Sequence, residues 1–174
     1  WDLGDAVHFT AAYFNLEKTD AKTTDLAGAV TLLGDQGVNG VEFTVAGTIL
    51  PRWNAYGGLS FMHGEVISSA QPSEEGVTLP YVPKAMLNLW TTYELPMRLT
   101  VGGGVNYSDG NFFNQTGTFN FVAGGTVSQP KYAANAPAIQ ALTEYFVVNA
   151  MASYPVHRHL TLQLNLNNIF NEKY

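Results

Sequence analysis

Two pairs of side chains have types and spacings suited to metal binding or acid–base chemistry. His157 and His159 form a His-x-His pair, which in a β-strand would place both imidazoles on one face and within reach of one metal ion. The surrounding residues predict a short turn without a nearby carboxylate, so solvated turn histidines are the favoured interpretation. His63 and Glu65 also share a face, but no nucleophile or second acid accompanies them. We therefore predict no catalytic residues and no metal ligands.

The composition narrows the remaining classes of site. The chain has 174 residues and no cysteine, which rules out disulfides, thiolate metal sites and cysteine nucleophiles. Its formal net charge of −6 argues against a nucleic-acid partner. The three glycines at 102–104 are not followed by a helical pattern, so they do not form a phosphate-binding loop. They instead favour strand bending or the close approach of another segment, and we expect no cofactor.

The pattern that must position these residues is a strict alternation of apolar and polar side chains. It is clearest near the C-terminus, where Leu160, Leu162, Leu164 and Leu166 alternate with Thr161, Gln163, Asn165 and Asn167. Such a period of two is typical of a β-strand, whereas a helix would scatter the leucines around its circumference. Similar patterns predict strands over 38–50, 53–66, 84–95, 98–113 and 144–155, with a stub at 1–3. The alternation over 6–22 is imperfect, and a bulge near Ala12 would reconcile it.

The connections between these strands also alternate, in this case by length. Short turns are predicted at 4–5, 51–52, 96–97 and 156–159, and long loops at 23–37, 67–83 and 114–143. In an antiparallel sheet all short turns then lie at one end and all long loops at the other, an asymmetry typical of outer-membrane β-barrels. The low charged fraction of 13%, against roughly 25% in soluble domains, agrees with this class. We predict an all-β fold, an antiparallel transmembrane β-barrel segment of about seven to eight strands.

Four aromatic residues near strand ends bear on the same question. Trp53, Tyr93, Tyr107 and Tyr154 lie on the apolar face, where their amphipathic rings suit a girdle at the membrane interface. Ordinary core aromatics are the alternative. Two other functional classes stay open on these patterns. One is a small closed outer-membrane barrel that serves as an adhesin or an enzyme, and the other is a soluble β-barrel lectin or lipid carrier.

The final residues carry a motif with family character. The stretch LNLNNIFNEKY resembles the closing motif of TonB-dependent outer-membrane siderophore receptors, an alternating strand that ends in an Asn-Leu-Phe-Asp-x-x-Tyr-like run. Further stretches resemble the same family in the same order, namely 11–22, 40–61, 82–95, 99–107 and 146–156. The resemblance extends to receptors of the ferric-catecholate type. The motif positions are Asn168, Ile169, Phe170, Asn171 and Tyr174, of which Ile169 and Asn171 are conservative departures.

The resemblance implies a role in transport and no bond chemistry. Residues 1–174 are expected to be the C-terminal portion of a roughly 22-stranded barrel in the outer membrane of a Gram-negative bacterium. The plug domain and the final strand are expected to lie outside the chain, as is the N-terminal region that contacts the TonB complex. The implied function is active transport of a ferric siderophore, energised by TonB. This segment would contribute barrel wall in contact with outer-membrane lipid, together with extracellular loops that capture the ligand.

The long loop 114–143 and the strand end before it supply the candidate ligand contacts. A ferric siderophore is bulky and often anionic, so aromatic rings with an occasional cation would suit it. For each of these residues an ordinary flexible surface loop is the alternative. The candidates are Phe112, Phe113, Gln129, Lys131 and Tyr132.

Overall fold

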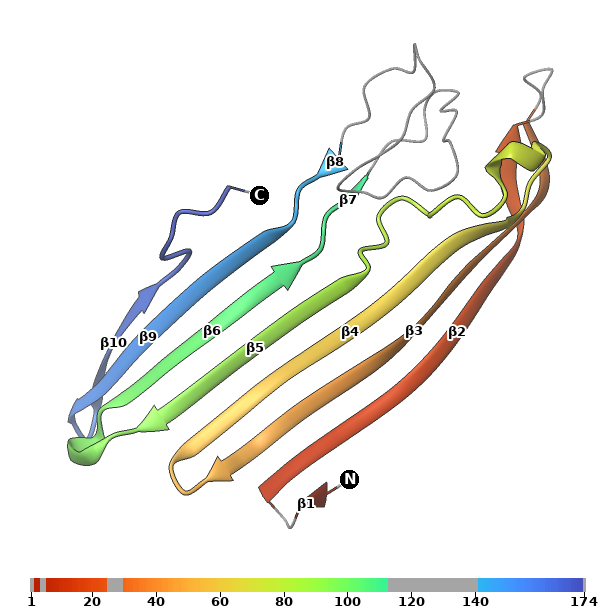
Figure 1. Ribbon diagram of the computed structural model, residues 1–174. Coiled ribbons are helices and arrows are strands. Elements are labelled where there is room, and N and C mark those ends of the chain that lie inside the picture. Colours follow the sequence, from red (N-terminus) through yellow and green to blue (C-terminus); the bar gives the residue numbers. More distant parts are fainter. Residues whose placement is uncertain (1, 4–5, 25–29, 113–140, 174) are drawn as a thin grey trace.

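The computed structural model describes residues 2–3, 6–24, 30–112 and 141–173, and these form an all-β architecture (Figure 1). The main sheet has eight strands, and every neighbouring pair is antiparallel. The predicted fold class and strand number are confirmed. The strands of the main sheet are β1 (Asp2–Leu3), β2 (Val7–Thr24), β3 (Val30–Leu50), β4 (Trp53–Ser68), β5 (Ala85–Glu94), β6 (Thr100–Ser108), β9 (Tyr145–His157) and β10 (Leu160–Leu166).

Two smaller kinds of element complete the described residues. A two-stranded sheet pairs β7 (Asn111–Phe112) with β8 (Ala141–Leu142). Two short 3-10 helices, η2 (Pro72–Glu74) and η3 (Pro96–Arg98), lie in connections. Across the described residues, none of the helices has the length and apolarity that crossing a membrane would require. The predicted asymmetry is visible in Figure 1, where the turns before β4, β6 and β10 lie at one end of the sheet and the longer connections at the other.

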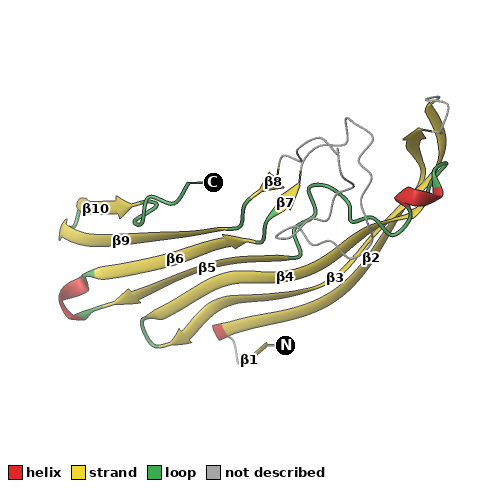
Figure 2. Cartoon of the chain, turned by 45° about the horizontal axis from the view of Figure 1, so that its top comes forward, coloured by secondary structure: helices red, strands yellow, loops and turns green. Residues whose placement is uncertain are grey.

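The strands form one curved layer that does not close on itself (Figure 2). Neighbours follow the order β1-β2-β3-β4-β5-β6-β9-β10, so β1 and β10 occupy opposite edges. An even strand number would have favoured the small closed barrel among the alternatives above. Because the described edge strands do not pair with one another, these eight strands form an open sheet.

Two expectations for the first hairpin are wrong, namely the extent of its loop and the position of its bulge. The segment 23–37 was expected to be a loop, but β2 continues to Thr24 and β3 begins at Val30, which pair with each other. No bulge lies near Ala12 either, because the register is unbroken from Val7–Gly47 to Lys18–Gln36. The register shifts occur later, on either side of Ala21. Backbone hydrogen bonds extend the ladder whether or not side chains alternate, so the sequence pattern ended before the strands did.

The pairing register divides the main sheet into two chemically different faces. We call the apolar one the outer face and the polar one the inner face. Cross-strand rows run over the outer face, and one of them joins Ala11, Phe43, Leu59, Leu87, Tyr107 and Phe146. Leu162 and Leu164 on this face are 59% and 60% exposed. The described sheet therefore does not bury its apolar face in a core, as a soluble sheet would.

The inner face contains two pairs in which an aromatic ring covers a glycine on the neighbouring strand. Phe14 is paired with Gly40 and Trp90 with Gly104. A Cβ atom on Gly40 would lie 2.7 Å from Cζ of Phe14, and one on Gly104 would overlap the six-membered ring of Trp90. Only glycine leaves room for these rings against the backbone, so part of the Gly102–Gly104 run serves to seat a tryptophan.

The chain leaves β10 through a compact turn that the Asn168 side chain organises. Asn168 Oδ1 accepts a hydrogen bond from the backbone N–H of Glu172 at 2.7 Å, and its Nδ2 donates to the carbonyl oxygen of Glu172 at 2.9 Å. The N–H of Asn171 donates to the carbonyl oxygen of Asn168 at 2.9 Å. Asn168 and Asn171 have φ values of 49° and 54°, a left-handed conformation that asparagine tolerates better than most residues.

The same turn is fixed to the neighbouring strand β9. The backbone N–H of Asn168 donates to Oδ1 of Asn149, and that of Ile169 donates to the carbonyl oxygen of Val148, both at 2.9 Å. The strand therefore stops at Leu166 while its backbone stays bonded to β9. Four of the five family-motif positions lie in this turn, and Tyr174 lies outside the described residues.

Enlarging Gly104 should damage the sheet, whereas enlarging the adjacent Gly103 should not. In Gly104→Ala the new methyl group meets the Trp90 ring and lies 2.7 Å from the carbonyl oxygen of Leu89. We expect the free energy of unfolding of the intact protein to fall by about 1–3 kcal/mol, the usual cost of overpacking. In Gly103→Ala the nearest atom would be the carbonyl oxygen of Asn149 at 3.7 Å, so we expect a change within about 0.5 kcal/mol. Urea unfolding of both variants in detergent measures the difference, and equal losses would contradict the account.

Removing the Asn168 side chain should open the turn after β10. Asn168→Ala loses both bonds to Glu172, and we expect a cost of about 1–3 kcal/mol in the free energy of unfolding. Hydrogen exchange at the Glu172 amide of the intact protein should accelerate in this variant. The exposed neighbour Asn167 supplies the control, because Asn167→Ala should leave that amide protected. Unchanged protection in Asn168→Ala would show that the side chain does not hold the turn.

Candidate functional site

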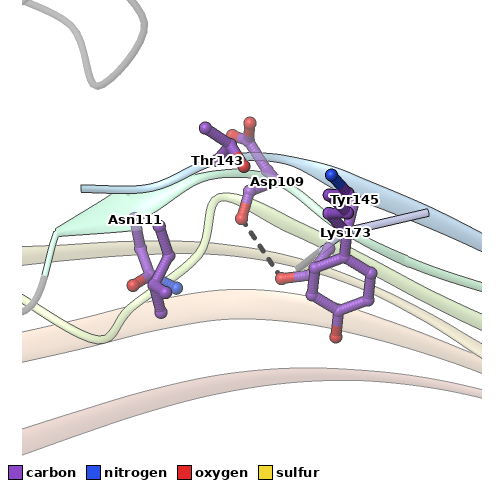
Figure 3. A pocket seen from close by; sticks show the side chains of 7 residues that line it. Asp109, Asn111, Thr143, Tyr145 and Lys173 are labelled. Carbon is purple, nitrogen blue, oxygen red and sulfur yellow. Dashed lines mark hydrogen bonds between the residues drawn. The ribbon is translucent and has the colours of Figure 1, made fainter.

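A hollow lies at the long-loop end of the sheet, where β6 and β9 emerge beside the β7–β8 pair (Figure 3). Its volume is about 390 Å³. Lys173 reaches it from the segment after β10, whereas the other side chains come from the ends of β6 and β9 and from the small sheet. The lining residues are Ser108, Asp109, Asn111, Leu142, Thr143, Tyr145 and Lys173.

The chemistry of this hollow is that of polar binding. It presents one carboxylate, one ammonium group and the hydroxyl groups of serine, threonine and tyrosine side chains. Asp109 is held in place, because its Oδ1 accepts from the N–H of Gly110 at 2.9 Å and its carbonyl oxygen accepts from Ser108 Oγ at 3.1 Å. Oδ1 of Asn111 is shielded from solvent and has no hydrogen-bond partner in the described part of the chain. The hollow therefore suits a ligand that exchanges hydrogen bonds.

The ligand-contact residues expected from the sequence fall mostly outside what the structure describes. Phe112 has its backbone in β7, next to Asn111, but its side chain is not described. Phe113, Gln129, Lys131 and Tyr132 lie outside the described residues. The sequence analysis did not single out Asp109, Tyr145 or Lys173. The sequence could have indicated Asp109 and Tyr145, because residues on the two sides of a loop that joins antiparallel strands must lie close together.

At the same end of the sheet, the connection between β4 and β5 braces the ends of β2, β3 and β4. It runs back along β4, so that Val66 N–H donates to the Val77 carbonyl oxygen and Leu79 N–H to the Gly64 carbonyl oxygen, each at 2.9 Å. A hydroxyl–carboxylate cluster ties β2 to the same connection. Oγ1 of Thr23 lies 2.6 Å from Oγ of Ser69, which donates to Oε2 of Glu74 at 2.5 Å. The extended ends of β2, β3 and β4 are therefore cross-linked beyond the apolar rows.

The structure places the four aromatic residues at two levels of the outer face. Trp53 is paired with Tyr93 near the short-turn end, and its Nε1 donates to Thr91 Oγ1 at 2.6 Å. Tyr154 lies at the same end, opposite Leu162. Tyr107 lies towards the long-loop end, in the row of Phe146. Phe146 and Tyr154 are eight residues apart on β9, or about 26 Å along the strand.

Neither histidine pair forms a catalytic arrangement. Nε2 of His63 lies 3.5 Å from Oε2 of Glu65, and the two side chains are 55% and 44% exposed. His157 and His159 flank Arg158 in the turn between β9 and β10. In the described residues no cluster of three or more histidine, aspartate or glutamate side chains could hold a metal ion.

Comparison with known proteins identifies the family. The model "TonB dependent receptor-like, beta-barrel" matches residues 1–169. The probable TonB-dependent receptor BfrD of Bordetella pertussis is 30% identical over 95% of this chain and 21% of its own length. The catecholate siderophore receptor Fiu of Escherichia coli K12 is 29% identical over 95% of this chain and 20% of its own length. The chain thus spans about a fifth of the length of the curated relatives it matches.

Solved structures show the same relationship. The siderophore receptor PiuA from Acinetobacter baumannii superposes with a TM-score of 0.74 and 29% identity, over 97% of this chain and 22% of the receptor. The closed form of Fiu from E. coli K12 gives a TM-score of 0.75 and 27% identity, over 97% of this chain and 21% of that receptor. The names of these relatives describe receptors and no enzyme. The family match and the open transmembrane sheet show that this chain belongs to the TonB-dependent receptor-like β-barrel family, which places it in the outer membrane of a Gram-negative bacterium.

Proposed function

We propose that the chain is part of a transporter that takes up a ferric siderophore across the outer membrane, energised by the TonB complex. The observation that carries this proposal is the similarity of nearly the whole chain to the siderophore receptors PiuA and Fiu. Fiu is described as a receptor for catecholate siderophores, and we propose a ligand of that class. The transported complex is cargo, and no resident cofactor takes part.

In this proposal the described sheet is one section of a larger wall. Lipid cannot satisfy free backbone groups, so a transmembrane sheet must close into a barrel. The open edges at β1 and β10 would pair with further strands of a barrel of roughly 22 strands. Residues 1–174 would be its C-terminal portion, while the plug, the final strand and the TonB-contacting region belong to other parts of the protein.

The long-loop end is proposed to face outward from the cell and to contribute to ligand capture. The polar hollow at the ends of β6 and β9 supports this role, because it offers hydrogen-bond donors and acceptors beside the longest loop. Phe112, Phe113, Gln129, Lys131 and Tyr132 stay predicted contacts of the ligand. The cross-linked ends of β2, β3 and β4 would form a stiff part of the same mouth.

The aromatic residues at two levels are proposed to mark the two membrane interfaces. With strands tilted by about 40°, the 26 Å between Tyr154 and Phe146 becomes about 20 Å across the membrane, close to the roughly 25 Å apolar band of such barrels. Trp53, Tyr93 and Tyr154 would form the girdle on the short-turn side. Tyr107 would lie at the opposite interface, and the apolar rows between these levels would contact lipid chains.

In a strain without other catecholate receptors, loss of the full-length protein should strongly slow uptake of a ferric catecholate. We expect iron-starved cells that lack the gene to import radioactive iron from its catecholate complex far more slowly than the parent strain, with rescue by the intact gene. A protonophore should remove the rescued uptake, because TonB-dependent transport requires an energised inner membrane. The control is a strain lacking an unrelated porin. Unchanged uptake in the deletion strain, with other catecholate receptors removed, would contradict the proposed ligand class.

A charge on the outer face should destabilise the barrel, and a charge on the inner face should not. Leu89 lies in the middle of the apolar rows and is paired with Gly57 and Val105. Leu89→Arg should therefore cost about 2–4 kcal/mol, as found for arginine at the bilayer midplane. The adjacent Asn88 points to the inner face, where it pairs with Gly58 and Asn106, so Asn88→Arg should cost much less. Unfolding in lipid vesicles compares the two, and a larger loss for Asn88→Arg would reverse the assignment of faces.

A further inference from the structure

The turn between β9 and β10 brings two histidines of the short-turn end close together. His157 is the last residue of β9 and is paired with Leu160, the first residue of β10. Arg158 and His159 form the two-residue connection. The imidazole centroids lie 5.7 Å apart, with an angle of 47° between the ring planes. Both residues are exposed, so an ion and its water ligands can reach the rings.

This separation is close to that of two imidazoles bound to one metal ion. A zinc–nitrogen bond is about 2.0–2.1 Å, and a ring nitrogen lies about 1.2 Å from the ring centre, so a bond angle between about 109° and 120° puts the centroids about 5.2–5.7 Å apart. The observed 5.7 Å lies at the upper end of this range. Because both side chains are exposed, rotation about their bonds can turn one nitrogen of each ring towards a shared ion.

We propose that the β9–β10 turn is a binding site for one divalent transition-metal ion, held by the imidazoles of His157 and His159. Imidazole ligands suit Zn²⁺, Ni²⁺ and Cu²⁺, and Cu²⁺ should bind most tightly of the three. The described residues provide no third histidine or carboxylate for the ion, so water fills the other coordination positions. Arg158 adds a like charge beside the ion, which keeps the affinity below that of a site with three or four protein ligands.

The site is separate from the proposed ligand route. It lies at the end of β9 opposite the hollow, as the β9–β10 hairpin in Figure 1 shows. An ion bound there would link the end of β9 to the start of β10. Binding to the folded state alone stabilises that state by mass action, so the hairpin should resist opening when the metal is present. The proposal therefore does not depend on which siderophore the protein transports.

Metal titration of the untagged full-length receptor in detergent tests the site. Calorimetry with ZnCl₂ and electron paramagnetic resonance with CuCl₂ should detect a site that His157→Ala and His159→Ala each weaken. The loss should exceed the roughly 10–100-fold effect that is typical of removing an outer-shell partner. The copper spectrum should show coupling to two nitrogen nuclei in the wild type and to one in either variant. His63→Ala is the matched control, since His63 is also exposed and lies beside Glu65.

The outcomes separate the proposal from a simple surface effect. Retention of the site in His63→Ala, with its loss in both turn variants, supports it. Equal stoichiometry and affinity in the wild type and the His157→Ala/His159→Ala double variant would overturn it. So would a copper spectrum with a single coupled nitrogen in the wild type. Circular dichroism and metal-free unfolding should be unchanged in the turn variants, because both side chains are exposed.

Discussion

The constraint on which the structure depends is the continuous antiparallel hydrogen-bond ladder from β1 to β10. A transmembrane strand has no water to satisfy its backbone, so every N–H and carbonyl must find a partner in a neighbouring strand. Pairing in a fixed register then sends alternate side chains to opposite faces over the whole sheet. This is why Leu59 and Leu87 share a row with Tyr107, although they lie far apart in the sequence.

Because the outer face of the sheet is apolar, the polar features described above lie mainly at the two ends of the strands. The long-loop end combines a polar hollow with cross-linked strand extensions, which suits a surface that meets a polar ligand. The short-turn end has tight connections, the paired rings of Trp53 and Tyr93, and the histidine pair of the β9–β10 turn. Each end therefore uses a different part of the same ladder, and a change at one end need not disturb the other.

Local packing on the inner face shows how the sheet accommodates large rings without a conventional core. Phe14 and Trp90 each lie over a glycine of the adjacent strand, so the rings approach the backbone where a methyl group would block them. The Asn168 turn solves a related problem at the end of β10. Its amide replaces backbone partners that the chain loses when it leaves the strand.

The sequence by itself determined the all-β class, the two faces, the alternation of short and long connections and the family, because these follow from local periodicity and from motifs such as Asn168–Phe170. It misjudged the segment 23–37, where pairing with Val30 and Gly34 extends β2 and β3 without side-chain alternation. Only the tertiary structure decided that Trp90 lies over Gly104, that Asp109 and Lys173 line one hollow, and that the rings of His157 and His159 lie 5.7 Å apart. The first two depend on register and on chain segments distant in sequence, and the third on the conformation of a turn, none of which local periodicity encodes.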